Sequence, residues 1–115
     1  MSWLSDPQAL ALIGREADDV DAVRWTGVVA AAVEWVEGRR PDIDFHPEDE
    51  TPPVVGADVI LGTAMLAGRW YDRGATPGGI AEHGEFGGAI LRHDPDIARL
   101  LGVGWSGRFV VGGPR

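Results

Sequence analysis

Residues 57–74, "ADVILGTAMLAGRWYDRG", carry the longest helical pattern in the chain and decide its fold class. At about 100° per residue, the charged side chains share one arc of a helix and apolar side chains fill most of the rest. We predict a helix over 53–73, capped by Thr51 and ended by Gly74 and Pro77. Such a helix must be covered on most sides, by its own domain or by neighbouring molecules. The residues of the polar arc are Asp58, Arg69, Asp72 and Arg73.

A short helix near the N-terminus is indicated by its end signals. Ser5 or Asp6 can cap it, Pro7 suits the first helical position, and Gly14 stands where a left-handed residue would end it. The same order of signals returns in "HDPDIARLLG", residues 93–102, which predicts a second short helix.

The remaining segments complete a single domain over 1–115. A longer amphipathic helix is predicted over 19–37, and 40–53 is predicted to be a connection because it holds four prolines. The turn signal "GEFGG" and the strand-like run "AILR" predict a hairpin or ordered loop over 78–93. We therefore expect a mainly α fold: a small bundle of two longer and two short helices in a body over 1–104. A glycine-rich loop or β-hairpin precedes the last helix, and an extended C-terminal tail covers 105–115.

The composition argues against a protein that grips nucleic acid. The formal net charge is −8, and all ten basic residues are arginines. Nucleic-acid footprints are basic patches, although an acidic surface can line a path past which DNA slides. The absence of cysteine excludes disulfides and thiolate metal sites. The sequence shows no signal peptide and no apolar run near the roughly 20 residues of a membrane span, so we expect a soluble intracellular protein without membrane contact.

Three histidines and a glycine-rich stretch are the candidates for cofactor chemistry. His46, His83 and His93 are 37 and 10 residues apart, without the close H-x-x-x-H or H-x-H spacing of a metal site. The glycines of residues 78–88 match neither the P-loop nor the dinucleotide-binding pattern, and the chain has no lysine. We expect no metal and no cofactor, and we expect the glycines to serve turns.

Pairs of carboxylates are the candidates for acid–base catalysis. Glu82 with Glu85 would be one pair, but the chain holds 18 acidic residues, so such pairs arise by chance. A second group of carboxylates lies in the proline-rich connection: Glu48, Asp49 and Glu50. The serines all lie near the termini: Ser2, Ser5 and Ser106. We therefore predict no active site and no enzymatic activity.

Assembly with other proteins fits the remaining features better. Five tryptophans in 115 residues is a high number, and tryptophan is enriched at interface hot spots. Trp3 and Trp105 lie near the termini, where burial within one chain is least assured. A glycine-rich excursion from a small helical body can be ordered by packing against a neighbour.

Residues 57–102, "ADVILGTAMLAGRWYDRGATPGGIAEHGEFGGAILRHDPDIARLLG", resemble the head–tail connector (head-to-tail adaptor) proteins of long-tailed bacteriophages. In that family a helix ending in an arginine–aromatic run leads into a glycine-rich segment, and a short "DPDIARLL" helix follows. The matching positions here are 69–73, Pro77, Gly78, 84–87 and 94–101.

The resemblance implies a non-enzymatic virion protein. Family members form a ring, typically of twelve copies, that docks beneath the portal protein at the neck of the virion. The ring extends the DNA channel towards a tail-side or head-completion protein, and genomic DNA passes through its lumen without sequence-specific binding. The implied location is the head–tail interface of the virion, after assembly in the host cytoplasm.

Three groups of residues receive roles from this resemblance and from the composition. Subunit or lumen contacts are expected of Asp58, Arg69 and Arg73. The expected assembly loop contains Gly78, Gly79, Glu85, Phe86 and Gly87. Portal docking is expected of Trp105, Arg108, Phe109, Val110 and Val111.

Two other functions remain open from the residues alone. A small helical regulatory protein would bind nucleic acid or a protein partner, with Arg69, Arg73 and Arg99 as its footprint. A small metal-dependent enzyme would use the histidines.

Overall fold

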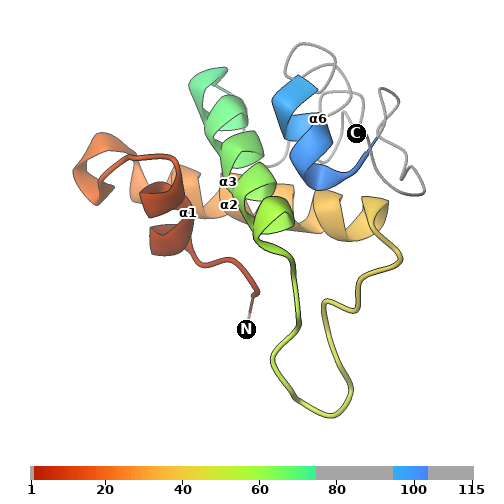
Figure 1. Ribbon diagram of the computed structural model, residues 1–115. Coiled ribbons are helices and arrows are strands. Elements are labelled where there is room, and N and C mark those ends of the chain that lie inside the picture. The colour runs from red at the N-terminus through yellow and green to blue at the C-terminus, as the bar shows by residue number, and fades with distance from the viewer. Residues whose placement is uncertain (1, 75–94, 104–115) are drawn as a thin grey trace.

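The computed structural model describes residues 2–74 and 95–103 of the chain (Figure 1). Its helical elements are α1 (Asp6–Leu12), the short 3-10 helix η1 (Ala17–Asp19), α2 (Ala22–Arg39), α3 (Ala57–Asp72) and α6 (Pro95–Leu101). The chain is thus mainly helical, and the predicted small bundle of two longer and two short helices is confirmed.

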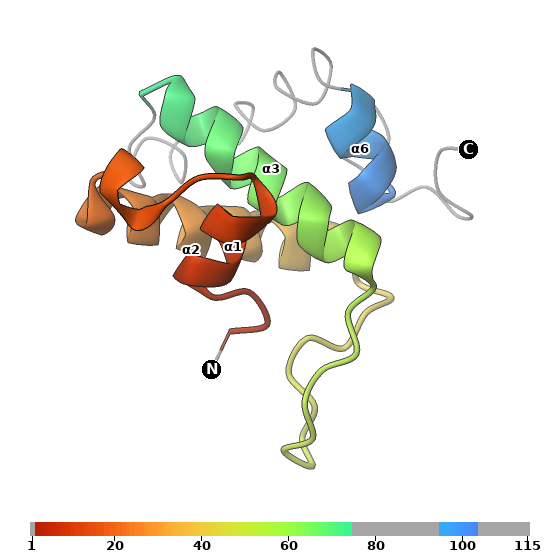
Figure 2. The ribbon, with the colours of Figure 1, turned by 60° about the vertical axis from the view of Figure 1, so that its left-hand side comes forward.

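Helix α3 lies at the centre of the bundle. Helix α2 packs across one side of it, and α1 and α6 flank it on the others (Figures 1 and 2). Eight of its residues are buried in this bundle: Val59, Gly62, Thr63, Ala64, Leu66, Ala67, Gly68 and Trp70. Most of the circumference of α3 is therefore covered by its own chain, while the side that carries Asp58, Arg69 and Asp72 stays exposed.

Gly62 allows α6 to lie close against α3. A Cβ atom placed on Gly62 would be 2.9 Å from Leu101 Cδ2 and 3.0 Å from Leu100 Cβ. Contacts under about 3 Å are too short for carbon atoms, whose attraction is best near 3.5–4.0 Å. A glycine at this position is therefore a packing requirement of the fold.

The helix ends that depend on local capping agree with the predictions. The Ser5 hydroxyl accepts a hydrogen bond from the Gln8 N–H at 3.2 Å, which caps α1. Gly14, Gly74 and Gly102 follow three of the helices with φ of 74°, 72° and 70°, values that glycine adopts at little cost.

Two predicted helix starts are wrong. Helix α2 begins at Ala22 with Asp21 as its cap, because η1 forms a separate turn before it. Helix α3 begins at Ala57, and Thr51 does not cap it. The Thr51 hydroxyl instead donates to Asp49 Oδ1 at 2.7 Å. Thr51 also precedes two successive prolines, and a residue before proline is disfavoured in helical conformation.

The N-terminal segment is held against the bundle through Trp3. Its indole N–H donates to Glu37 Oε2 at 2.9 Å, and its ring lies 5.0 Å from that of the buried Phe45. His46 Nε2 lies 3.0 Å from the other carboxylate oxygen of Glu37. Trp3 is therefore engaged within its own chain, and it is not a free interface residue.

Arg40 ties the end of α6 to the connection between α2 and α3. Its Nη1 donates to the carbonyl of Leu101 at 2.7 Å, while Nε and Nη2 donate to the two oxygens of Asp42 at 2.9 and 2.8 Å. These hydrogen bonds from Arg40 hold the pKa of Asp42 below its usual value. The same interaction raises the pKa of Arg40.

We expect the Arg40–Asp42 pair to contribute to an acid-induced loss of stability. Because the pKa of Asp42 is lower in the folded chain, its carboxylate stabilises the fold above the unfolded pKa of about 4. That contribution is lost as the pH falls through the folded pKa. Asp42→Asn should make the free energy of unfolding depend less steeply on pH below about pH 4. The difference should stay under about 1 kcal/mol, because the Asp42 side chain is 40% exposed.

Urea unfolding at several pH values, followed by circular dichroism, measures this difference. Arg40→Gln removes the cause of the shift and should flatten the pH dependence in the same way. An Asp42→Asn variant with the wild-type pH dependence would show that the pair does not act as described.

None of the helices in 2–74 and 95–103 is both long and apolar enough to cross a bilayer.

Candidate functional site

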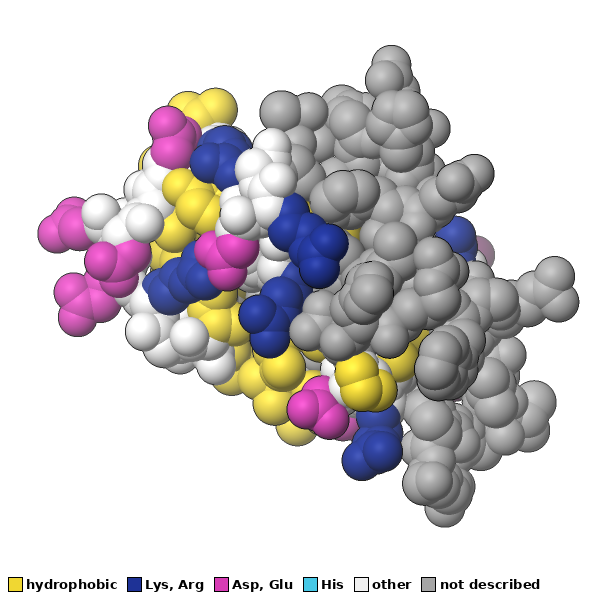
Figure 3. All heavy atoms as spheres, turned by 90° about the horizontal axis from the view of Figure 1, so that it is seen from above, with side chains coloured by type: hydrophobic (Ala, Val, Ile, Leu, Met, Phe, Trp, Pro, Cys, Tyr) yellow, Lys and Arg dark blue, Asp and Glu magenta, His cyan; other side chains and the backbone are white. Residues whose placement is uncertain are grey.

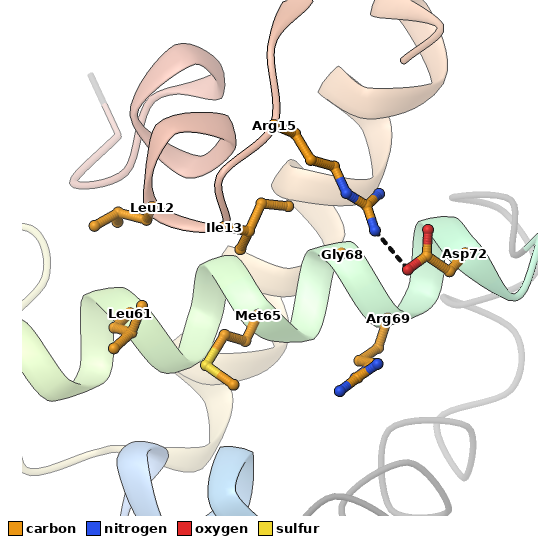
Figure 4. Close-up of a pocket in the computed structure, with 8 residues that line it drawn as sticks. All are labelled: Leu12, Ile13, Arg15, Leu61, Met65, Gly68, Arg69 and Asp72. Atoms are coloured by element: carbon orange, nitrogen blue, oxygen red, sulfur yellow. Dashed lines mark hydrogen bonds and ion pairs between the residues drawn. The ribbon is translucent and has the colours of Figure 1, made fainter. Parts of the chain in front are cut away.

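A groove lies between the end of α1 and the exposed side of α3 (Figure 4). Its volume is about 350 Å³. Leu12 and Ile13 lie on one side of α3, and Met65 and Arg69 extend from α3 on the other (Figure 4). The lining is apolar along most of its length and charged at the end nearest the C-terminus of α3. We call this feature the groove, and its lining residues are Leu12, Ile13, Arg15, Leu61, Met65, Gly68, Arg69 and Asp72.

The turn after α1 positions the charged end of the groove. Gly14, with φ of 74°, redirects the chain so that Arg15 faces the last turn of α3. Arg15 Nη2 donates to Asp72 Oδ2 at 2.6 Å, and this hydrogen bond raises the pKa of Arg15. Ile13 reaches α3 where Gly68 leaves room, since a Cβ on that glycine would lie 3.2 Å from Ile13 Cδ1.

A second arginine is held at the same end of α3. The Arg24 guanidinium lies 4.0 Å from the centre of the Tyr71 ring, and its Nη2 donates to the Tyr71 carbonyl. The Tyr71 hydroxyl in turn accepts the N–H of Asp21 at 2.9 Å. These contacts fix the entry of α2 against the last turn of α3.

Arginines gather around this end of α3. The described residues include Arg15, Arg24, Arg39, Arg40, Arg69, Arg73 and Arg99, and more than half of these lie on or against the last turn of α3. Carboxylates accompany them: Asp72 pairs with Arg15, and Asp19 is close enough to act on its charge. From above, arginine side chains lie beside a strip of hydrophobic side chains with carboxylates nearby (Figure 3). In a chain of net charge −8, this local gathering of arginine stands out.

The groove is suited to binding, and its lining residues do not form a catalytic group. Its polar side chains are two arginines and one aspartate, with no nucleophile among its lining residues. Within the described parts of the chain, no group of three or more His, Cys, Asp or Glu residues could hold a metal ion. An apolar groove with arginines at one end favours a segment that offers an apolar side chain beside carboxylates.

The predicted contact residues of α3 do not form one site. Asp58, Arg69 and Arg73 are all exposed, and they follow one polar stripe as their spacing predicted. Arg69 and Arg73 lie in and beside the groove. Asp58 lies in the first turn, roughly 16 Å from Arg69 along the axis, because each helical residue rises 1.5 Å. Its Oδ1 accepts the N–H of Val59 at 2.9 Å.

The other predicted contact residues lie outside the described residues. These are the assembly loop (Gly78, Gly79, Glu85, Phe86 and Gly87) and the portal-docking tail (Trp105, Arg108, Phe109, Val110 and Val111). His83, His93, Glu82 and Ser106 lie outside them as well. The third arginine of the footprint expected for a regulator, Arg99, is exposed on α6.

Sequence reasoning missed most of the groove. Leu12 and Arg15 come from the end of α1, and Leu61 and Met65 come from α3, almost 50 residues later. Neither segment carries a sequence pattern that indicates contact with the other. A weak signal was present in Leu12, which interrupts the polar side of a short helix and is 40% exposed.

Comparison of the chain with models of protein families, with curated protein sequences and with solved structures found no match.

Proposed function

We propose that this chain is a structural subunit of a phage head–tail connector. It would form a ring of about twelve copies beneath the portal protein, join the capsid to a tail-side protein, and extend the channel through which genomic DNA passes. The observation that carries the proposal is the order of features in residues 57–102: a helix with an arginine–aromatic end, a glycine-rich segment and a short "DPDIARLL" helix.

Two features of the described residues support a binding role of this kind. The part of the pattern in α3 and α6 folds as two helices packed together, with Ile97 and Leu101 buried and with Arg69 and Arg73 exposed. A wall of net negative charge also suits a DNA conduit, because it repels phosphate and does not retain it.

Light scattering of the purified protein, alone and mixed with the portal protein, tests this function. We expect either a ring of the free chain or a stoichiometric complex with the portal. A ring formed from one surface meeting a different surface on the next copy closes at a defined mass. A chain that stays monomeric and ignores the portal would overturn the proposal.

Removal of residues 105–115 tests the proposed portal-docking tail. The described core reaches Val103, which is 1% exposed, so the truncated chain should keep its helical circular dichroism spectrum. We expect it to lose binding to the portal in the light-scattering experiment. Undiminished portal binding would assign docking to another part of the chain.

The arginines at the end of α3 favour a second candidate function, a regulator that binds nucleic acid. Asp72 and Asp19 among those arginines oppose it, because phosphate-binding surfaces are predominantly basic. A mobility-shift assay separates the two functions. A regulator would shift DNA at low salt and lose affinity steeply as salt rises, because binding releases counterions.

A further inference from the structure

The connection between α2 and α3 projects from the helical body as an arm. We define the arm as residues 41–56, and both ribbon views show it extending away from the helices (Figures 1 and 2). Its base is anchored by Phe45, which is 6% exposed beneath Trp3, and by the Arg40–Asp42 ion pair. The arm therefore projects from the helical body while its base is fixed by these contacts.

The outer part of the arm combines acidic side chains with one apolar side chain. A turn at its far end is closed by a hydrogen bond from the Glu50 N–H to the Pro47 carbonyl at 3.3 Å. Glu48, Asp49 and Glu50 are all exposed there. Val54, a few residues on, is 92% exposed, the most exposed of the large hydrophobic residues in the described parts.

The groove offers the complementary arrangement. Leu12, Leu61 and Met65 provide apolar surface, and Arg69 lies one helical turn beyond Met65, with Arg73 one turn further. A chain with net charge −8 repels an acidic segment over most of its surface. The last turn of α3 is where the described arginines gather, so it is the place on this protein that suits such a segment best.

One chain cannot join its own arm to the arginine end of its own groove. The arm enters α3 at Ala57, whereas Arg69 and Arg73 lie at the other end of that helix, roughly 18–24 Å away. The anchored base also directs the arm away from the helices (Figure 2). An arm in a groove is therefore a contact between two copies, and it joins two unlike surfaces.

We propose that the arm of each copy docks in the groove of the next copy. Val54 packs against Leu12 and Met65. The carboxylates of Glu48, Asp49 and Glu50 lie against Arg69 and Arg73. A contact between unlike surfaces leaves one arm and one groove free on every pair, so further copies can add, and a ring forms where the rotation between copies closes. This inference rests on the proposed ring function and assigns the interface that builds the ring.

Charge reversal on each side tests the contact. The groove variant carries Arg69→Glu and Arg73→Glu, and the arm variant carries Glu48→Arg, Asp49→Arg and Glu50→Arg. Each variant alone should raise the dissociation constant for assembly roughly tenfold or more, because like charges then face each other. All five positions are exposed, so both variants should keep the wild-type circular dichroism spectrum.

A mixture of the two variants provides the decisive result. Every arm in the mixture then finds a groove of opposite charge on the other variant, so an equimolar mixture should assemble with alternating subunits. Light scattering measures the mass in each case. If the wild-type chain assembles only on the portal, the number of bound copies per portal is the readout.

Two further variants separate the apolar contact from general effects of charge. Val54→Ser should weaken assembly and leave folding unchanged, because this side chain is 92% exposed. Glu34→Arg reverses an exposed charge on α2, outside the arm and the groove, and should assemble as the wild type does.

The outcomes distinguish the contact from the proposed function. If the groove variant and the arm variant both assemble as well as the wild type does, the arm contact is overturned and the connector function still stands. Loss of assembly in the groove variant alone, without rescue in the mixture, would show that another segment occupies the groove. A wild-type chain that neither assembles nor binds the portal would overturn both.

Discussion

Replacement of Trp70 by alanine is expected to lower the free energy of unfolding by about 3–5 kcal/mol. Trp70 lies on α3 and is fully buried at 0% exposure. Its ring meets that of Trp35 on α2 edge to face, with centroids 6.4 Å apart. Truncation to alanine removes the whole indole from the contact between the two longest helices. Since small domains have unfolding free energies of about 5–15 kcal/mol, the variant should be close to unfolding at 37 °C.

Urea unfolding followed by circular dichroism at 222 nm measures this loss without relying on tryptophan fluorescence. Trp70→Phe should cost clearly less, because a phenyl ring fills much of the same space. Trp3→Ala provides a peripheral comparison, since Trp3 is only partly buried and lies outside the contact between α2 and α3. If Trp70→Ala unfolds within 1 kcal/mol of the wild type, the packing of α2 on α3 differs from that described.

Replacement of Gly62 by valine is expected to lower the free energy of unfolding by about 1–3 kcal/mol through overpacking. Leu100 and Leu101 of α6 occupy the space that the new side chain needs, at 2.9–3.0 Å from the position of its Cβ. Helix α6 must then shift away from α3 or bend its leucines out of their rotamers. We also expect the loss to appear in the contacts of α6, so the hydrogen bond from Arg40 to the Leu101 carbonyl should weaken.

Gly38→Val is the matched control for Gly62→Val. Gly38 lies near the end of α2, and a Cβ there would meet no atom within 4 Å. The same chemical change should therefore alter the unfolding free energy by no more than about 0.5 kcal/mol. Equal losses in the two variants would show that the approach of α6 is not what limits position 62. Urea unfolding of both proteins at one pH makes the comparison.

Local interactions explain why so much of the helical pattern could be predicted. The cap at Ser5 and the glycines at 14, 74 and 102 act within one helical turn, so the residues that decide these ends lie beside one another in the sequence. The polar stripe of α3 follows from the helical period alone. The start of α3 escaped prediction because Thr51 has a local alternative in Asp49, which competes with capping.

By itself, the sequence determined the helical class, the ends of α1, α3 and α6 at their glycines and the stripe of charge along α3, because each depends on neighbours within about four residues. Only the tertiary structure decided what covers α3 and where charged residues meet. Arg15 reaches Asp72 across 57 positions, and Arg40 reaches Leu101 across 61. Contacts at such separations depend on how the helices cross, which is settled by the shape of many side chains together, with Gly62 and Gly68 leaving the space for α6 and Ile13. The groove and the arm are products of that packing, and no short stretch of the sequence contains either of them whole.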